Sequence, residues 1–216
     1  MNYTGEVVPG VDARGVKSVS REFILPEAEL GDFAANGVRG IEYHAWGGEG
    51  APKNGSLGFD LIAKFNVVMD FRNLKIFLIK GTGYPPGYDI DAWPKVPFTA
   101  DGRMITDATV NDKVIRLLWD TATPVSSIKT TTKISGDVQS CSETILFKLA
   151  TNSSICKKIT TTNFVISGHD FGSMVFHTRS MPGLPVDGMV GDDFFEDHVV
   201  YLDFARRMVA IHKAAS

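Results

Sequence analysis

Apolar and polar positions alternate in short runs along most of the chain, and turn residues separate one run from the next. Residues 104–110 (MITDATV) and 113–119 (KVIRLLW) are two such runs, joined by an Asn-Asp pair. A period of two is typical of strands with one buried face, and a short polar pair between two strands is typical of a hairpin. The pattern therefore predicts a mainly β protein with short strands and many turns.

One arrangement of glycines, acids and apolar residues occurs twice. Residues 52–79 read PKNGSLGFDLIAKFNVVMDFRNLKIFLI, and residues 185–212 read PVDGMVGDDFFEDHVVYLDFARRMVAIH. They align without gaps at an offset of 185 − 52 = 133 positions. The aligned identities include Pro52 with Pro185, Gly58 with Gly191, Asp60 with Asp193, Val67 with Val200 and Asp70 with Asp203. This shared register indicates an internal duplication. We call residues 52–79 the first closing segment and residues 185–212 the second closing segment.

Each closing segment predicts the same succession of elements. An apolar step ends in Gly and leads into a short helical turn, at 59–65 in the first segment and 192–198 in the second. An acid near the start of such a turn favours its exposed N–H groups. A hairpin with a charged turn follows, predicted at 66–79 and 199–212. On these grounds alone Asp60 and Asp193 are helix-start residues.

Bulk composition excludes some classes of function. The chain has 216 residues, 44% of them hydrophobic and 22% charged, and its formal net charge is −3. Such a composition is typical of a globular protein with a real core, and it offers no basic surface for nucleic acid. No apolar stretch approaches the roughly 20 residues of a membrane-spanning helix, so we expect no membrane span.

The two cysteines, Cys141 and Cys156, leave two interpretations open. They stand 156 − 141 = 15 residues apart, which matches no zinc-ligand spacing. They are either unrelated thiols or a disulfide that closes a hairpin-sized loop. A disulfide would imply an oxidising compartment, and thus a periplasmic or secreted protein.

The motif LLWDTAT at residues 117–123, taken with the second closing segment, resembles the retropepsin-like and pepsin-like aspartic proteases. In that family each lobe has a hydrophobic-hydrophobic-Asp-Thr/Ser-Gly loop and ends with hydrophobic-hydrophobic-Gly, a short helix and a hairpin. The bacterial two-lobed members are the most similar. The resemblance implies closed β-barrel lobes: a complete second lobe at 98–213, a linker at 84–97 and, at 1–83, the C-terminal part of a first lobe that lacks its Asp-Thr-Gly segment.

Carried over to this chain, the resemblance implies a set of site residues. Asp120 would be the catalytic aspartate, Thr121 would tie the lobes together, and Ala122 stands where the family has Gly. Residues 189–191 would pack beneath this loop. A flap hairpin at 143–159, with Cys141 and Cys156 on or beside it, would close over a peptide substrate. The residues at its tip would be Ala150, Thr151, Asn152 and Ser153.

The implied activity is hydrolysis of peptide bonds by a water activated between two aspartates that share one proton. No cofactor or metal is expected. Only one Asp-Thr motif is present, so the second aspartate would come from another copy of the chain, as a homodimer, or from a missing amino-terminal segment of the first lobe. The alternative is an inactive, protease-derived module for peptide binding or dimerisation. Without the repeat, Asp120 would be an ordinary Asp that opens a turn after a buried strand.

Overall fold

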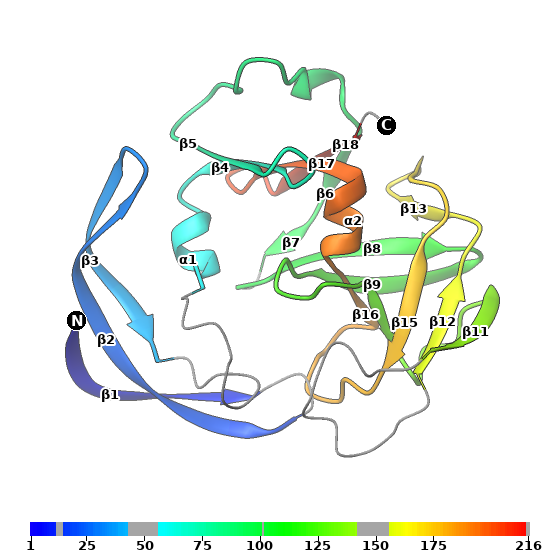
Figure 1. Ribbon diagram of the computed structural model, residues 1–216, viewed down its shortest axis with the longest axis horizontal. Coiled ribbons are helices and arrows are strands. Elements are labelled where there is room, and N and C mark those ends of the chain that lie inside the picture. Colours follow the sequence, from blue (N-terminus) through cyan, green and yellow to red (C-terminus); the bar gives the residue numbers. More distant parts are fainter. Residues whose placement is uncertain (12–14, 43–55, 101, 142–155, 215–216) are drawn as a thin grey trace. The chain divides into compact units, whose positions relative to one another are not determined.

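The computed structural model describes residues 1–11, 15–42, 56–100, 102–141 and 156–214, and they divide between two compact units (Figure 1). The amino-terminal unit contains an antiparallel three-stranded sheet of β1 (Asn2–Val11), β2 (Lys17–Leu30) and β3 (Phe33–Ile41). None of the side chains of these three strands is buried. Ion pairs join its strands on the surface, among them Arg39–Glu22 at 2.9 Å.

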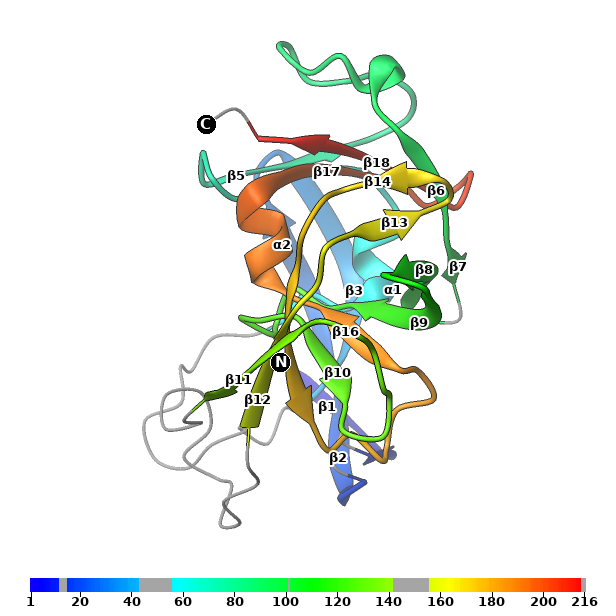
Figure 2. The same ribbon diagram turned by 90° about the vertical axis from the view of Figure 1, so that its right-hand side faces the viewer.

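The second unit is built on a long curled sheet and a smaller one. Along the long sheet the strand order is β11-β12-β15-β10-β16-β9-β8-β13-β14, with β7 paired to β8 (Figure 2). Its strands are β7 (Thr99–Ala100), β8 (Met104–Val110), β9 (Lys113–Trp119), β10 (Ser127–Lys129), β11 (Asp137–Cys141), β12 (Cys156–Thr160), β13 (Phe164–Ile166), β14 (His169–Asp170), β15 (Val175–Arg179) and β16 (Gly188–Val190). The prediction of a mainly β chain is confirmed, and the long sheet curls as a half-barrel.

The smaller sheet has the order β5-β4-β17-β18-β6 and joins strands from both predicted lobes. Its strands are β4 (Asn66–Asp70), β5 (Lys75–Ile79), β6 (Lys95–Pro97), β17 (His198–Asp203) and β18 (Met208–Lys213). The helical elements are α1 (Phe59–Ile62), the 3₁₀ turn η1 (Ile90–Ala92) and α2 (Asp192–Asp197).

The two closing segments adopt the same structure at the same offset. In β4–β5 Asn66 pairs with Ile79, and in β17–β18 Val199 pairs with His212, 133 positions later in both strands. The segments then pair with each other through β4 and β17, where Val68 lies opposite Tyr201. Since 68 + 133 = 201, the smaller sheet has a local pseudo-two-fold axis at this pair. The turns match as well: Leu74 and Arg207, again 133 apart, both have φ of 54°.

Aromatic packing holds α2 against the curled sheet. The ring of Trp119, the last residue of β9, meets Phe194 and Phe195 edge-on at centroid distances of 5.3 and 5.7 Å. Phe164 from β13 packs on Phe194 at 5.8 Å. These side chains are buried, and buried rings in edge-to-face contact add to the hydrophobic stabilisation. The end of β9 is therefore held rigidly, and the next residue is Asp120.

Candidate functional site

Asp120 lies at the end of β9 in a tight turn. Its Oδ1 accepts a hydrogen bond from the Ala122 N–H at 2.9 Å, and its carbonyl oxygen accepts one from the Thr123 N–H at 3.2 Å. Its own N–H donates to the Val190 carbonyl at 3.0 Å. The side chain is half-buried. One carboxylate oxygen is thus fixed by the backbone while the residue keeps access to solvent.

Ala122 fits this turn without backbone strain. The four non-glycine residues at positive φ within the described parts of the chain are Leu74, Asn111, Ser167 and Arg207. Ala122 is exposed, and its φ lies outside the left-handed region that would favour glycine. Replacement of the family's Gly by Ala therefore costs this turn no φ strain. The neighbouring Thr121 is exposed as well, and its tie between the lobes stays a prediction.

Strand β16 lies between β9 and β10 and locks the two ends of the Asp120 loop together (Figure 2). It runs parallel to β9, with Val190 opposite Trp119, and antiparallel to β10, with Met189 opposite Ser127. Val190 is completely buried. The interpretation of residues 189–191 as the support beneath the loop agrees with this pairing.

Gly191, which follows β16, is required by close packing. A Cβ at this position would stand 2.6 Å from the Thr123 carbonyl oxygen and 2.7 Å from the Val125 carbonyl carbon, closer than real Cβ atoms come to backbone. The Gly191 N–H also donates to the Ser126 Oγ at 3.1 Å. Any side chain here would push the Asp120 loop off the start of α2.

Asp193 does more than begin a helix. Its carboxylate accepts hydrogen bonds from the Ser126 N–H, at 2.9 and 2.8 Å to its two oxygens, and from the Ser126 Oγ at 2.7 Å. It also accepts from the Phe194 N–H at 3.0 Å. Sequence reasoning missed this link to Ser126. The signal that could have found it was the recurrence of Asp193 as Asp60 in the first closing segment.

Asp192 is a second acid beside the Asp120 loop. Its N–H donates to the Thr123 carbonyl at 2.8 Å, and its Oδ1 is buried without a hydrogen-bond partner among the described residues. Burial, together with the negative charges of Glu196, Asp120 and Asp193, raises the pKa of Asp192 to about 6. Sequence reasoning did not select Asp192.

Asp187, directly before β16, is hydrogen-bonded to β9. Its Oδ2 accepts from the Arg116 N–H at 2.9 Å, and its Oδ1 from the Thr132 Oγ1 at 3.3 Å. Its own N–H donates to the Arg116 carbonyl at 2.9 Å. The acid therefore ties the start of the second closing segment to the strand that carries Asp120.

The predicted flap tip, Ala150, Thr151, Asn152 and Ser153, lies outside the described residues. The strands that lead to it, β11 and β12, are antiparallel, and Cys141 lies opposite Cys156 in their register. Cys141 is disulfide-bonded. The base of the hairpin is therefore compatible with the predicted loop-closing disulfide.

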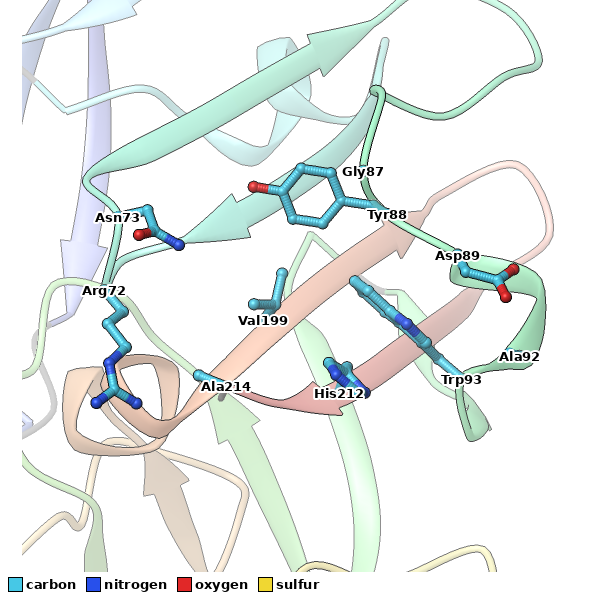
Figure 3. Close-up of a pocket in the computed structure, with 10 residues that line it drawn as sticks. All are labelled: Arg72, Asn73, Gly87, Tyr88, Asp89, Ala92, Trp93, Val199, His212 and Ala214. Carbon is cyan, nitrogen blue, oxygen red and sulfur yellow. The ribbon is translucent and has the colours of Figure 1, made fainter. Parts of the chain in front are cut away.

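A cavity lies over the smaller sheet, and Asp120 is not among the residues that line it. It has a volume of about 610 Å³, and Figure 3 shows Trp93 and His212 side by side within it, with Tyr88 and Arg72 further along its wall. The Trp93 and His212 rings stack at 5.2 Å. Two aromatic residues of the predicted linker at 84–97, Tyr88 and Trp93, thus line this cavity.

Two of the described histidines, His198 and His212, stack on aromatic rings. His198 is buried, stacks on Phe194 at 4.1 Å, and its Nδ1 lies 3.0 Å from the Phe194 carbonyl oxygen. Burial lowers the pKa of His198. Among the described residues, no group of three or more His, Cys, Asp or Glu side chains is arranged to hold a metal ion.

Comparisons with known proteins find only a distant similarity of fold. No protein-family model matches the chain, and no curated protein matches it. Among solved structures it is similar to a retropepsin-like aspartic protease from Rickettsia conorii, with 18% sequence identity and a TM-score of 0.38 over 56% of this chain and 92% of that one. This is a distant likeness of fold. Within the described residues, no helix is long and apolar enough to cross a membrane.

Proposed function

We propose that the chain is part of an aspartic-type peptidase in which Asp120 supplies one of the two carboxylates. The observation that carries the proposal is the fixed geometry of Asp120: Oδ1 is held by the Ala122 N–H at 2.9 Å, and the side chain stays half-buried at the end of a rigid strand. A catalytic carboxylate needs this combination of a set orientation and access to water.

The chemistry needs a second carboxylate a few ångström from Asp120. Two like charges at that distance cannot both ionise, so the pair holds one proton; the ionised member activates a water, and the protonated member donates to the peptide carbonyl oxygen. The chain contains a single Asp-Thr motif, so the partner comes from outside it, from a second copy or from a separate amino-terminal segment. The substrate would be an extended peptide or protein.

The matching registers of the two closing segments support this proposal. Hairpins related by an offset of 133 in sequence are related by a local two-fold axis in space. We infer that both derive from one ancestral unit, and that the unit once carried an Asp loop in each copy. The flap tip and Thr121 would contribute to substrate binding and to contact between the lobes.

The test is hydrolysis of an unfolded protein between pH 3 and pH 7, at several chain concentrations. We expect Asp120→Asn to abolish cleavage and Asp112→Asn, an exposed acid in the β8–β9 turn, to leave it unchanged. Cleavage that rises with the square of the concentration would mean that a second copy supplies the partner. Cleavage that persists in Asp120→Asn would refute the role of Asp120.

The single Asp-Thr motif favours one second candidate, an inactive module that still binds extended peptides. It differs from the enzyme in a measurable way. Peptide binding that survives Asp120→Asn, together with no turnover at any pH or concentration, would favour the inactive module.

A further inference from the structure

We propose that the cavity over the smaller sheet binds a small aromatic carboxylate. The ring of this ligand would extend the stack of Trp93 and His212, and its carboxylate would pair with the guanidinium of Arg72. All the residues that line the cavity belong to the second unit, and none is part of the Asp120 loop. The proposal therefore goes beyond the proposed peptidase and does not depend on it.

The cavity has the size and the lining of a small-molecule site. Its volume of about 610 Å³ lies within the range of roughly 300–1,000 Å³ that is usual for ligand pockets. Val199 of β17 and His212 of β18, opposite each other in register, contribute to its lining from the sheet. Tyr88 and Trp93 line it on one side, and Arg72, in the turn between β4 and β5, lines it on the other (Figure 3). Aromatic surface with a few charged groups can both bury and orient a small ligand.

The aromatic end of the cavity is built around a buried tryptophan. Trp93 is 8% exposed, and its ring meets Tyr88 edge-on at 6.3 Å. His212 lies parallel to the Trp93 ring at 5.2 Å, with an interplanar angle of 14°, and is itself exposed. Stacked rings gain more than the area they bury, so this end favours a planar ring over a saturated group of the same size.

The other end of the cavity carries a positive charge. Arg72 is exposed, and it forms no ion pair with the part of the chain that the structure describes. A guanidinium binds a carboxylate through two parallel hydrogen bonds, which fixes the orientation of the anion as well as attracting it. Asp89, the one acid that lines the cavity, lies far from Arg72, and its carboxylate points away from the other lining side chains (Figure 3). The charge distribution therefore favours an anionic group at Arg72.

The buried side chain of Asp70 holds the two sides of the cavity together. Its Oδ1 accepts the Asn73 N–H at 3.1 Å, and its Oδ2 accepts the Asn73 side-chain amide at 2.8 Å and the Tyr88 hydroxyl at 2.7 Å. Burial by itself would raise the pKa of Asp70, but the hydrogen bonds from Asn73 and Tyr88 lower it, so the carboxylate stays ionised at neutral pH. Asn73 belongs to the same turn as Arg72, and Tyr88 belongs to the aromatic side. The site is thus preorganised, which reduces the cost of binding.

The duplication shows that the fold does not require the charged and polar groups of this cavity. The local two-fold axis relates Arg72 to Ala205 and His212 to Ile79, at the offset of 133. Ile79 is partly buried and packs against the hydrophobic cluster on this face of the sheet. The equivalent positions therefore keep the same backbone structure with a methyl group and an aliphatic side chain. The repeat itself supplies the substitutions that test the site.

Titration of the full chain with naphthylacetate, followed by calorimetry, tests the proposal. We expect saturable binding, which Arg72→Ala should weaken roughly tenfold because the charge-assisted hydrogen bonds are lost. His212→Ile should weaken it about threefold because the stacked ring is lost. The neutral amide of the ligand should bind the parent chain and Arg72→Ala equally, and the saturated decahydronaphthyl acid should bind more weakly than naphthylacetate.

The matched control is Lys213→Ala, which removes an exposed cation beside His212 that does not line the cavity. It should bind naphthylacetate as the parent chain does, and the thermal unfolding of Arg72→Ala should match that of the parent. The imidazole proton resonances of His212 should shift on binding, because an aromatic ring comes to lie against them.

Absence of saturable binding, equal binding of the acid and its amide, equal binding of the planar and the saturated acid, or His212 resonances that do not move would overturn the site. Asp120→Asn should bind naphthylacetate as the parent does. Loss of the peptidase proposal would therefore leave this site untouched, and absence of binding would leave the role of Asp120 untouched.

Discussion

The first and second closing segments carry the same pattern, yet they differ in what their leading residues do. Both form a short helix and a hairpin in the same register, and both place an Asp at the end of the first strand, where its Oδ1 accepts a turn N–H, from Asn73 in one and Arg206 in the other. At the start of the helix the two segments differ, because among the described residues a loop packs over the helix start of the second segment and none over that of the first. Hairpin formation is local, whereas a glycine or carboxylate matters only where something lies against it.

The largest difference in unfolding free energy is expected between substitutions of the two equivalent glycines, Gly191 and Gly58. Gly191→Ala would place a methyl group 2.6 Å from the Thr123 carbonyl, so we expect a loss of about 2–3 kcal/mol of unfolding free energy. Gly58→Ala should change it by less than about 0.5 kcal/mol, because the one atom in the way is the mobile end of an exposed Asp side chain. Urea denaturation of both variants measures the difference. Equal effects would show that the two helix starts are packed alike after all.

Substitution of the two equivalent aspartates, Asp193 and Asp60, should give the next largest difference in unfolding free energy. Asp193→Ala removes the acceptor of the Ser126 N–H and hydroxyl and leaves a buried serine unsatisfied, so we expect a cost of about 2 kcal/mol. Asp60→Ala should leave the unfolding free energy of the chain almost unchanged. Thermal unfolding at neutral pH compares the two. A loss at Asp60 as large as that at Asp193 would show that Asp60 is as tightly packed in the folded chain as Asp193 is.

A smaller difference between the two closing segments is expected in how the unfolding free energy depends on pH. The first closing segment has Phe59 where the second has Asp192, whose pKa is raised to about 6 by burial and by Glu196, Asp120 and Asp193. A raised pKa in the folded state means that the protonated form is favoured, so stability is full below pH about 4, falls as pH rises to about 6, and stays lower above that. Asp192→Asn should remove this fall and gain about 1 kcal/mol at pH 7, after allowance for solvent screening.

Unfolding free energies measured from pH 3.5 to pH 7.5 check this expectation. The parent chain and Asp192→Asn should converge at the acidic end and separate as pH rises. Glu196→Gln is the matched variant, since it removes one of the charges that raise the Asp192 pKa while Asp192 stays in place. Parallel curves at all pH values would mean that Asp192 titrates as an ordinary surface acid.

Much of the fold could be predicted from local pattern. The hairpin at 104–119 forms where period-two alternation and the Asn-Asp turn place it, with Asn111 at φ of 50°. The left-handed Leu74 and Arg207 could not be predicted, because neither residue type favours that conformation. The predicted helical turn at 59–65 forms only over Phe59–Ile62.

The candidate site was predictable only in part. Asp120 was found because its motif is contiguous in the sequence. Ser126, Asp187 and Asp192 were missed as partners or neighbours of the site, because their contacts join residues about 55 to 71 positions apart. Amino-acid composition and the periodicity of apolar residues do not reveal hydrogen bonds between residues so far apart in the sequence.

The sequence by itself determined the strands, the repeat at an offset of 133 and the one Asp-Thr motif, because periodicity, turn chemistry and internal likeness are written along the chain. Only the tertiary structure decided that Gly191 and Asp193 hold the Asp120 loop, while in the part of the chain that the structure describes no loop packs against Gly58 and Asp60. The physical reason is that the same residue stabilises or does nothing according to whether another segment packs against it, and packing brings together residues that the chain keeps far apart.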